Sequence, residues 1–381
     1  MTLKLAKRGS VAPFIVMDVM RAANEREAQG GDVIHLEVGQ PSSGAPKGVL
    51  EATQKALMSD KIGYTDALGI PALRERIARY YKDYYGVNVG AERVVVTTGS
   101  SSGFLLSFLA AFEDGDKVGL TAPGYPAYRN ILKALGYVPV EIPVGPETHF
   151  QPTPEILESY PDLDGLIVAS PGNPTGSMLS RDDLKALCRY CDEHKIRFIS
   201  DEIYHGITYD CRADTAVEFS EDAIIINSFS KYFSMTGWRL GWMIVPQDMV
   251  RPIECLAQNM FISAPTLSQF GGVAAFDCIE EADRNVALYA KNRELLLNEL
   301  PKAGFTKLAP SDGAFYIYSE ISHLTDDAED FCKKILSKTG VATTPGVDFD
   351  NARGHQFMRF SYAGSFDQMV EAAKRLHIFL K

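Results

Sequence analysis

Between residues 93 and 246 the chain alternates short, almost continuously apolar runs with longer segments of helical periodicity. Runs of adjacent apolar residues are typical of strands that helices cover on both faces of a sheet. The pattern therefore predicts βαβ units and a doubly wound, mostly parallel α/β sheet. The predicted strands span residues 94–98, 117–123, 166–170, 197–202, 223–230 and 239–246.

One helical face is clear in residues 182–195, where Leu184, Leu187, Cys188 and Cys191 recur at helical spacing. We interpret Cys188 and Cys191 as core residues rather than a redox or metal pair. Both lie on this apolar face, and no second pair follows at the spacing of a zinc site. No two of the seven His have metal-motif spacing either, so we predict no metal site.

The two ends of the chain have a different pattern. Near the N-terminus it predicts a helix over residues 16–29 and a strand over residues 32–38, and later it predicts one long helix over residues 268–300. Short strand-like segments follow at residues 313–318, 341–346 and 358–363. These elements indicate a smaller α+β unit built from both termini.

Length and composition fit such an organisation, because 381 residues suffice for two or three domains of about 150 residues. We expect residues 41–275 to form a large domain, and residues 1–40 and 276–381 to form a small domain together. Hydrophobic residues make up 46% and charged residues 23% of the chain. These are ordinary globular values, which exclude a disordered chain or a coiled coil.

Charge and cysteine content narrow the class of protein. Asp and Glu outnumber Lys and Arg by 49 to 38, and the net charge of -11 opposes binding to nucleic acid. Six Cys are too sparse for a secreted disulfide framework. Pro13 interrupts the apolar stretch near the N-terminus, and the apolar stretch at residues 103–112 has half of the about 20 residues that a membrane helix needs. We therefore expect a cytoplasmic protein with small-molecule substrates, and neither a nucleic-acid nor a membrane partner.

Small and polar residues follow five of the predicted strands, in the sequences TTGSSSG, TAPGYP, ASPGNPTG, SDEIY and NSFSK. In open α/β sheets, ligands bind beyond the carboxyl ends of the strands. We therefore expect the five endings to face one pocket.

The densest of these signals is NSFSKYFSMTGWRLGW, residues 227–242. Lys231 directly follows a strand, where burial would lower the pKa of its amine and free it to attack a carbonyl. The hydroxyls of Ser228 and Ser230 and the guanidinium of Arg239 are groups that bind phosphate. A lone Lys with a later Arg is common on protein surfaces. Together with the other polar strand endings, however, the pair indicates a site for a phosphorylated aldehyde.

Three other endings offer groups for a cofactor: two suit an electron-withdrawing ring, and one suits an anion. Asp201 provides a carboxylate for a protonated ring nitrogen, and Tyr204 a phenol for a ring hydroxyl. Two Pro and two Gly hold Asn173 in a tight turn, where its amide could bond the same ring oxygen. Ser100 and Ser101 open a predicted helix after a strand, which favours an anion at the helix N-terminus. This loop lacks the Lys of a P-loop and the spacing of G-x-G-x-x-G.

Together these motifs resemble the class I/II aminotransferases, pyridoxal 5′-phosphate (PLP) enzymes of the aspartate aminotransferase fold (fold type I). The resemblance covers nearly the whole chain, from LEVGQPS through GYTDALGIPALRERIA, PGNPTG, SDEIY and SFSKYFSMTGWRLG to MRFSYA. It implies a mostly parallel seven-stranded sheet and a homodimer with shared active sites. It also implies a ping-pong reaction that moves an amino group between an L-amino acid and a 2-oxo acid.

The resemblance implies a role for each matching position. Lys231 resembles the lysine that forms the Schiff base and transfers protons, and Asp201 resembles the partner of the pyridine nitrogen. Asn173 and Tyr204 resemble the ligands of the ring hydroxyl, and Tyr125 the aromatic residue that stacks on the ring.

The phosphate and the substrate also have matching positions. The implied phosphate ligands are Ser100, Ser101, Ser228 and Arg239. Tyr64 resembles the tyrosine that reaches the phosphate of the neighbouring subunit. Gly39 and Arg359, with Asn173, match the positions that hold the substrate α-carboxylate, and Arg359 does so by a bidentate salt link.

Two positions differ from the aspartate-specific members of the family. The loop GSSSG holds no Lys, which one subgroup uses for the side-chain carboxylate, and Tyr125 stands where these enzymes commonly have Trp. We therefore do not predict a preference for dicarboxylic substrates, and a broader, aromatic or neutral range fits better.

Two alternatives share the fold. A PLP-dependent carbon–sulfur β-lyase has the same cofactor residues, because only the substrate pocket decides the reaction. A non-catalytic aminotransferase-like regulator is disfavoured, because the segment before LEVGQPS contains no basic recognition helix.

Overall fold

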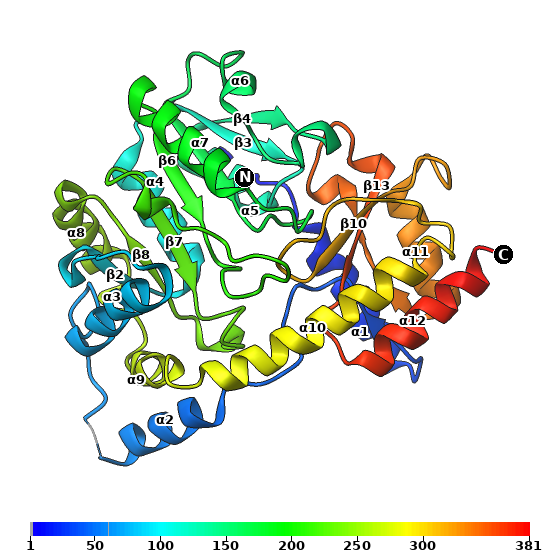
Figure 1. Ribbon diagram of the computed structural model, residues 1–381, viewed down its shortest axis with the longest axis horizontal. Helices are drawn as coiled ribbons and strands as arrows, with labels where there is room; N and C mark the ends of the chain where they lie inside the picture. Colours follow the sequence, from blue (N-terminus) through cyan, green and yellow to red (C-terminus); the bar gives the residue numbers. More distant parts are fainter. Residues whose placement is uncertain (1–2, 60) are drawn as a thin grey trace.

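The computed structural model describes residues 3–59 and 61–381 (Figure 1). Its largest sheet has seven strands in the order β2-β8-β7-β6-β5-β3-β4. Strand β8 runs antiparallel to both of its neighbours, and the other neighbouring pairs are parallel. The strands are β2 (Val94–Thr97), β3 (Lys117–Ala122), β4 (Val138–Pro143), β5 (Gly165–Ala169), β6 (Arg197–Asp201), β7 (Ile224–Ser228) and β8 (Gly241–Ile244). The predicted mostly parallel α/β fold is confirmed.

Helices cover both faces of this sheet, and alternate residues of β5 show how. Leu166 and Val168 pack in a core that also contains residues of α3 and α7. Ile167, between them, packs in a second core with residues of α4, α5 and α8. The helices are α3 (Pro71–Tyr85), α4 (Gly99–Ala111), α5 (Pro126–Leu135), α7 (Arg181–His194) and α8 (Val250–Met260). Cys188 and Cys191 of α7 are fully buried in the first core, as interpreted from the sequence.

The edge strand β4 is an element for which no sequence range was predicted. It carries two Pro and one Glu, and Ile142 is the one residue of the strand that is buried. An edge strand tolerates such residues because one side of it forms no ladder. It therefore lacks the continuous apolar run by which the other six strands were predicted.

The prediction of one helix over residues 268–300 is wrong. The segment forms two helices, α9 (Thr266–Ala275) and α10 (Ile279–Glu299). Phe276 lies between them and packs its ring among those of Phe229, Phe233 and Trp242. The chain turns between the two helices where this ring is buried. The apolar periodicity of the sequence does not reveal that turn.

Segments from the N-terminal and C-terminal parts of the chain pack together beside the large sheet (Figure 1). Strand β1 (Ile34–His35) pairs in parallel with β11 (Val341–Ala342), and a four-stranded antiparallel sheet has the order β12-β13-β10-β9. Its strands are β9 (Lys307–Leu308), β10 (Tyr316–Glu320), β12 (Thr344–Pro345) and β13 (Phe357–Ser361). The remaining helices are α1 (Ile15–Ala28), α2 (Lys47–Ser59), α6 (Pro154–Leu157), α11 (Ala328–Thr339) and α12 (Phe366–Phe379). The domain boundaries given above stay a prediction.

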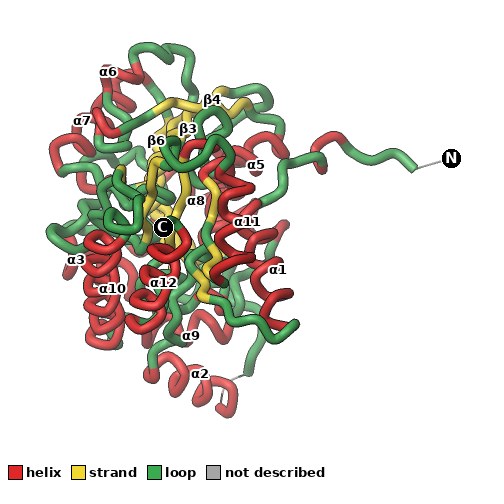
Figure 2. The backbone as a smooth tube through the Cα atoms, turned by 90° about the vertical axis from the view of Figure 1, so that its right-hand side faces the viewer, coloured by secondary structure: helices red, strands yellow, loops and turns green. Residues whose placement is uncertain are grey.

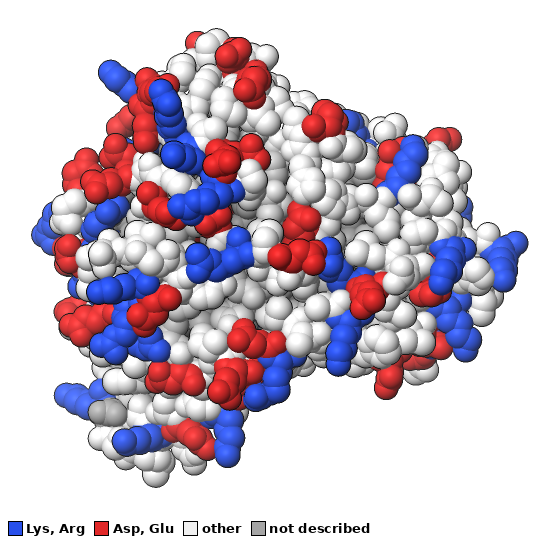
Figure 3. All heavy atoms as spheres, in the orientation of Figure 1, with Lys and Arg blue, Asp and Glu red and all other residues white. Residues whose placement is uncertain are grey.

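The surface and the N-terminal segment bear on possible partners. Figure 2 shows residues before α1 extending away from the body of the molecule. On the face in Figure 3, acidic and basic side chains are intermixed. Among the described residues, no helix has the length and apolar character of a membrane-spanning one. In the same residues, no group of three or more His, Cys, Asp or Glu is placed to hold a metal ion.

Candidate active site

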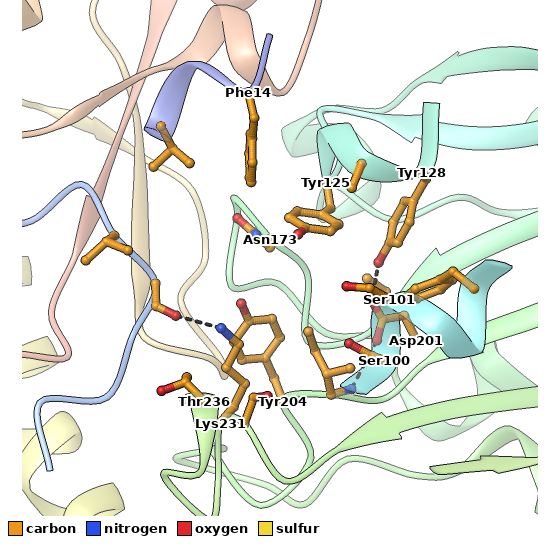
Figure 4. A pocket seen from close by; sticks show the side chains of 18 of the residues that line it. Phe14, Ser100, Ser101, Tyr125, Tyr128, Asn173, Asp201, Tyr204, Lys231 and Thr236 are labelled. Carbon is orange, nitrogen blue, oxygen red and sulfur yellow. Dashed lines mark hydrogen bonds between the residues drawn. The ribbon is translucent and has the colours of Figure 1, made fainter. Parts of the chain in front are cut away.

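A cavity of about 200 Å³ lies where the parallel strands end (Figure 4). Residues from all five polar strand endings line it, together with residues from both ends of the chain. The residues singled out in the sequence that line it are Gly39, Ser100, Ser101, Tyr125, Asn173, Asp201, Tyr204, Ser230, Lys231, Arg239 and Arg359. The topology of the sheet thus brings together side chains that are far apart in the sequence.

Lys231 follows β7 and extends its side chain into the cavity. Its Nζ donates a hydrogen bond of 2.6 Å to the carbonyl of Gly39. Burial, together with the positive charges of Arg359 and Arg239, lowers the pKa of Lys231 to about 8, although Asp201 acts in the opposite direction. The neutral amine, the form that acts as a nucleophile or base, is therefore more populated near neutral pH than in an exposed lysine.

Asp201 ends β6 and is almost fully buried. Its Oδ2 accepts a hydrogen bond from the hydroxyl of Tyr128, and its Oδ1 accepts one of 3.2 Å from the amide of Ile203. Burial raises the pKa of Asp201 to about 6, against the lowering effect of the Tyr128 hydrogen bond. A carboxylate in such surroundings is stabilised by a positively charged partner.

Sequence reasoning missed Tyr128. It lies three residues after Tyr125, one turn along the start of α5, and it also lines the cavity. The spacing in GYPAY was the signal that could have found it, because residues three apart share one face of a helix.

Three groups lie around Lys231 and Asp201. The hydroxyl of Tyr204 lies 2.7 Å from that of Tyr316, and the ring centroid of Tyr204 lies 5.8 Å from Nζ of Lys231. The side-chain oxygen of Asn173 accepts a hydrogen bond of 2.7 Å from Arg359 Nη1. Tyr125 immediately precedes α5, and its ring meets that of Phe14 edge-on at 5.7 Å (Figure 4).

One end of the cavity is suited to an anion. Helix α4 begins at Gly99, so Ser100 and Ser101 lie in its first turn, where the amide groups are free of helical partners. Gly99 has a positive φ of 70°, and a Cβ there would collide with the guanidinium of Arg239. Arg239 therefore lies against the helix N-terminus, and both carry positive charge toward the same space.

Two predicted phosphate ligands do not line this cavity. Ser228 is still part of β7, and its hydroxyl lies 2.9 Å from that of Ser230 and 3.3 Å from the carbonyl of Leu240. Ser230, also singled out from the sequence, and Thr236 line the cavity, and the role of Ser228 toward a phosphate stays a prediction. Tyr64 is 84% exposed on the surface, so its role toward a neighbouring subunit stays a prediction.

Arg359 of β13 is buried in another wall of the cavity. Its Nη2 donates to the carbonyl of Glu37, and the rings of Tyr316 and Phe349 lie 4.3 and 4.8 Å from its guanidinium carbon. Its Nε is buried without a hydrogen-bond partner among the described residues. A Cβ at Gly39 would collide with the hydroxyl of Tyr316, so glycine is needed for this close approach.

Another wall is apolar, and sequence reasoning missed it as well. Phe14, Val16 and Met17, from the start of α1, form this wall, and Val38 and Ile131 also line the cavity. Their pattern in the sequence is that of ordinary helix and strand positions, so only the folded chain reveals that they meet.

Comparison with known proteins identifies the family. Residues 31–376 match the model of the family described as aminotransferase class I and II. The chain belongs to this family. It is 50% identical to a valine–pyruvate aminotransferase of Mycobacterium tuberculosis, over 100% of this chain and 99% of the relative. It is 33% identical to an aspartate aminotransferase of Pyrococcus horikoshii, over 94% of this chain and 93% of the relative.

Solved structures agree with this assignment. A crystal structure of an aminotransferase from Mycobacterium tuberculosis superimposes with a TM-score of 0.98 at 50% identity, covering 100% of this chain and 99% of that one. The structure of aspartate aminotransferase from Thermus thermophilus with maleate superimposes with a TM-score of 0.92 at 30% identity, covering 99% of this chain and 100% of that one. The chain is therefore an enzyme that transfers amino groups between an amino acid and a 2-oxo acid, as predicted, and the β-lyase alternative is not favoured.

Proposed function

We propose that this aminotransferase binds PLP in the cavity and transfers the amino group of an L-amino acid with an apolar side chain, such as valine, to a small 2-oxo acid such as pyruvate. The apolar wall that Phe14, Val16 and Met17 form is the observation that carries the substrate class. Among the described residues of the lining, the cations are Lys231, Arg239 and Arg359, each of which has another role in this proposal. The name of the mycobacterial relative, valine–pyruvate aminotransferase, supports the same class.

The residues present fit PLP at three places. Lys231 offers a buried amine of lowered pKa for the aldehyde, and Asp201 a buried carboxylate for the ring nitrogen. The start of α4 and Arg239 offer an anion site, and the absence of a side chain at Gly99 lets the Arg239 guanidinium lie there. When bound, PLP supplies an aldehyde that takes up the amino group and a ring that withdraws electrons from the donor Cα.

The proposed catalytic work of the chain is proton transfer at the donor Cα. Lys231 Nζ removes this proton and later delivers it, for which a pKa near 8 is well matched to neutral solution. Asp201, oriented by Tyr128, keeps a proton on the ring nitrogen through its negative charge. Tyr204 and Asn173 are the proposed ligands of the ring hydroxyl, and Tyr125 packs on the ring.

The remaining roles concern binding. The proposed phosphate ligands that line the cavity are Ser100, Ser101, Ser230, Thr236 and Arg239, and Ser228, whose hydroxyl lies 2.9 Å from that of Ser230, is proposed with them. Arg359 binds the substrate α-carboxylate, with Gly39 and Asn173 beside it. Its Nε is a buried donor without an acceptor among the described residues, which supports this role because buried donors are normally hydrogen-bonded. These contacts leave the donor side chain to the apolar wall.

We further propose a homodimer. Near Tyr64, the amide of Thr65 donates to Ser263 Oγ at 3.4 Å, so two loops with exposed apolar residues adjoin there. The exposed apolar side chains of these loops and of the end of α2 are Leu57, Met58, Ile62, Met260 and Ile262. In the single chain Ser101 and Arg239 at the anion end are exposed. The projecting N-terminal segment adds Leu3 and Leu5, which are 93% and 90% exposed. A second chain would cover such surfaces.

The substrate class predicts a preference among donors. With pyruvate as acceptor, we expect kcat/KM for L-valine to exceed that for L-aspartate at least about tenfold, because a carboxylate placed against an apolar wall loses its hydration without gaining a partner. Steady-state rates over a range of each donor measure the ratio. A higher kcat/KM for aspartate would refute the apolar substrate class while leaving transamination intact.

The shared site predicts complementation between two variants. Tyr64→Phe should weaken PLP binding about three- to tenfold by removing one hydrogen bond, and Lys231→Ala should be inactive. In a hybrid dimer of the two chains, one site then has both defects and the other has neither. At limiting PLP we expect the purified hybrid to show activity with wild-type PLP affinity. Weak PLP binding in every active hybrid site would mean that Tyr64 acts within its own chain.

A further inference from the structure

The first turn of α1 is capped by a carboxylate from near the other end of the chain. Asp348 lies in the 3-10 helix η7 (Gly346–Asp348). Its Oδ1 accepts a hydrogen bond of 3.1 Å from the amide of Ile15, and its Oδ2 accepts one of 3.1 Å from the amide of Val16. Phe14, the N-cap residue, has no side-chain acceptor of its own. Asp348 thus satisfies two helix N–H groups and places a negative charge at the positive end of the helix.

The position of Asp348 is itself well fixed. The residue is 2% exposed, and its carbonyl accepts a hydrogen bond of 3.4 Å from Nη2 of Arg129. Arg129 belongs to α5, the helix that Tyr125 precedes, and is paired with Glu141 at 2.9 Å. Asp348 therefore ties the start of α1 to the same helix that borders the cavity.

The capped turn is the one that forms the apolar wall. Val16 and Met17 line the cavity, and the ring of Phe14 points toward Tyr125 (Figure 4). Behind this turn, between α1 and α11, lies a hollow of about 390 Å³, lined by residues that include Ile15, Val19 and Leu336. Side chains do not fill that space, so packing on this side of α1 constrains the first turn little, and the two hydrogen bonds to Asp348 help to hold it.

We propose that Asp348 is a positioning residue for substrate specificity. By capping α1 it holds Phe14, Val16 and Met17 at the distance that suits a branched donor side chain. Asp348 does not line the cavity itself, and it affects the wall by fixing the first turn of α1. This inference rests on the proposed function, in which the apolar wall receives the donor side chain.

The expected effect follows from the size of the donor. The side chain of L-valine has two carbons more than that of L-alanine, and each added carbon that an apolar wall buries contributes roughly fourfold to binding. A wall held in place therefore favours valine over alanine by roughly 15-fold in kcat/KM. A wall that shifts toward the hollow behind it loses most of this factor. Asp348 also interacts electrostatically with Arg359, but an effect on the α-carboxylate is common to both donors and cancels in their ratio.

The test compares Asp348→Ala and Asp348→Asn with Asp350→Asn. Asp350 is a matched control, because it is also buried and its Oδ1 accepts from two amides, those of Ala352 and Arg353, at 2.9 Å each. Those two residues do not line the cavity. Asp348→Asn keeps the shape of the side chain but can accept with one atom only, so it serves if the alanine variant fails to fold.

The readouts are kcat and KM for L-valine and L-alanine and the dissociation constant of PLP. We expect the valine-to-alanine ratio of kcat/KM to fall about tenfold in Asp348→Ala and about threefold in Asp348→Asn. The loss should lie mainly in KM for valine, with PLP affinity unchanged within about twofold, and Asp350→Asn should keep the wild-type ratio. Equal losses for both donors, an unchanged ratio in both Asp348 variants, or the same change in Asp350→Asn would overturn the inference. If wild-type enzyme prefers aspartate to valine, the proposed function itself fails.

Discussion

Replacing Lys231 by Ala is expected to lower the transamination rate by more than about 1,000-fold. Lys231 is the only amine among the described residues that line the cavity, so no neighbouring side chain can take over proton transfer at the donor Cα. Its Nζ makes one hydrogen bond to protein, to the carbonyl of Gly39, and the loss of that bond has little effect on the fold. The expected defect is therefore in chemistry rather than in stability.

The measurement is kcat with saturating L-valine and pyruvate, together with a thermal melt and a PLP titration. The variant should fold and bind PLP without a covalent link. Lys117→Ala is the matched control. Lys117 is the first residue of β3, at the end of the strand away from the cavity, and forms an exposed ion pair with Asp162 at 3.3 Å. Turnover of Lys231→Ala within tenfold of wild type would refute the proposed role.

Replacing Arg359 by Ala is expected to raise KM for the amino acid about 100-fold or more, with a smaller effect on kcat. Loss of one partner of a buried, hydrogen-bonded charge pair costs about this much in binding. The α-carboxylate is common to all donors, so valine and alanine should be affected alike. This distinguishes the effect from that of Asp348, which concerns the side chain.

Arg359→Lys separates charge from geometry. Lysine keeps the positive charge but lacks the planar fork that binds a carboxylate through two parallel hydrogen bonds, so an intermediate KM is expected. Arg359 also holds Asn173 and the carbonyl of Glu37, and a PLP titration of each variant controls for changes at these contacts. An unchanged KM in Arg359→Ala would show that another group binds the substrate carboxylate.

The fold could be predicted to the extent that burial leaves a mark on the sequence. Strand β5 lies between two cores, so its residues are apolar without interruption, and such strands were found. Strand β4 at the sheet edge is under no such constraint, and its two Pro hid it. The break at Phe276 depends on aromatic rings that are distant in the sequence, which a local period cannot register.

The site could be predicted where the sheet itself brings residues together. Asp201 and Lys231 follow neighbouring parallel strands, so their approach follows from topology. Ser228 and Ser230 show the limit of this reasoning. The pattern NSFSK does not tell which of the two lies within β7 and which lines the cavity. The apolar wall and Asp348 were not predictable, since they depend on contacts between distant parts of the chain, such as Phe14 with Tyr125 and Asp348 with the start of α1.

The most direct test of the proposed reaction is the visible absorbance of the PLP-loaded protein mixed with L-valine in the absence of any 2-oxo acid. Transamination predicts that the visible band is lost in proportion to the number of sites, that one 2-oxo acid forms per site, and that pyruvate restores the band. A band that persists with every amino acid tested, or 2-oxo acid and ammonia that accumulate far beyond one equivalent per site, would contradict it.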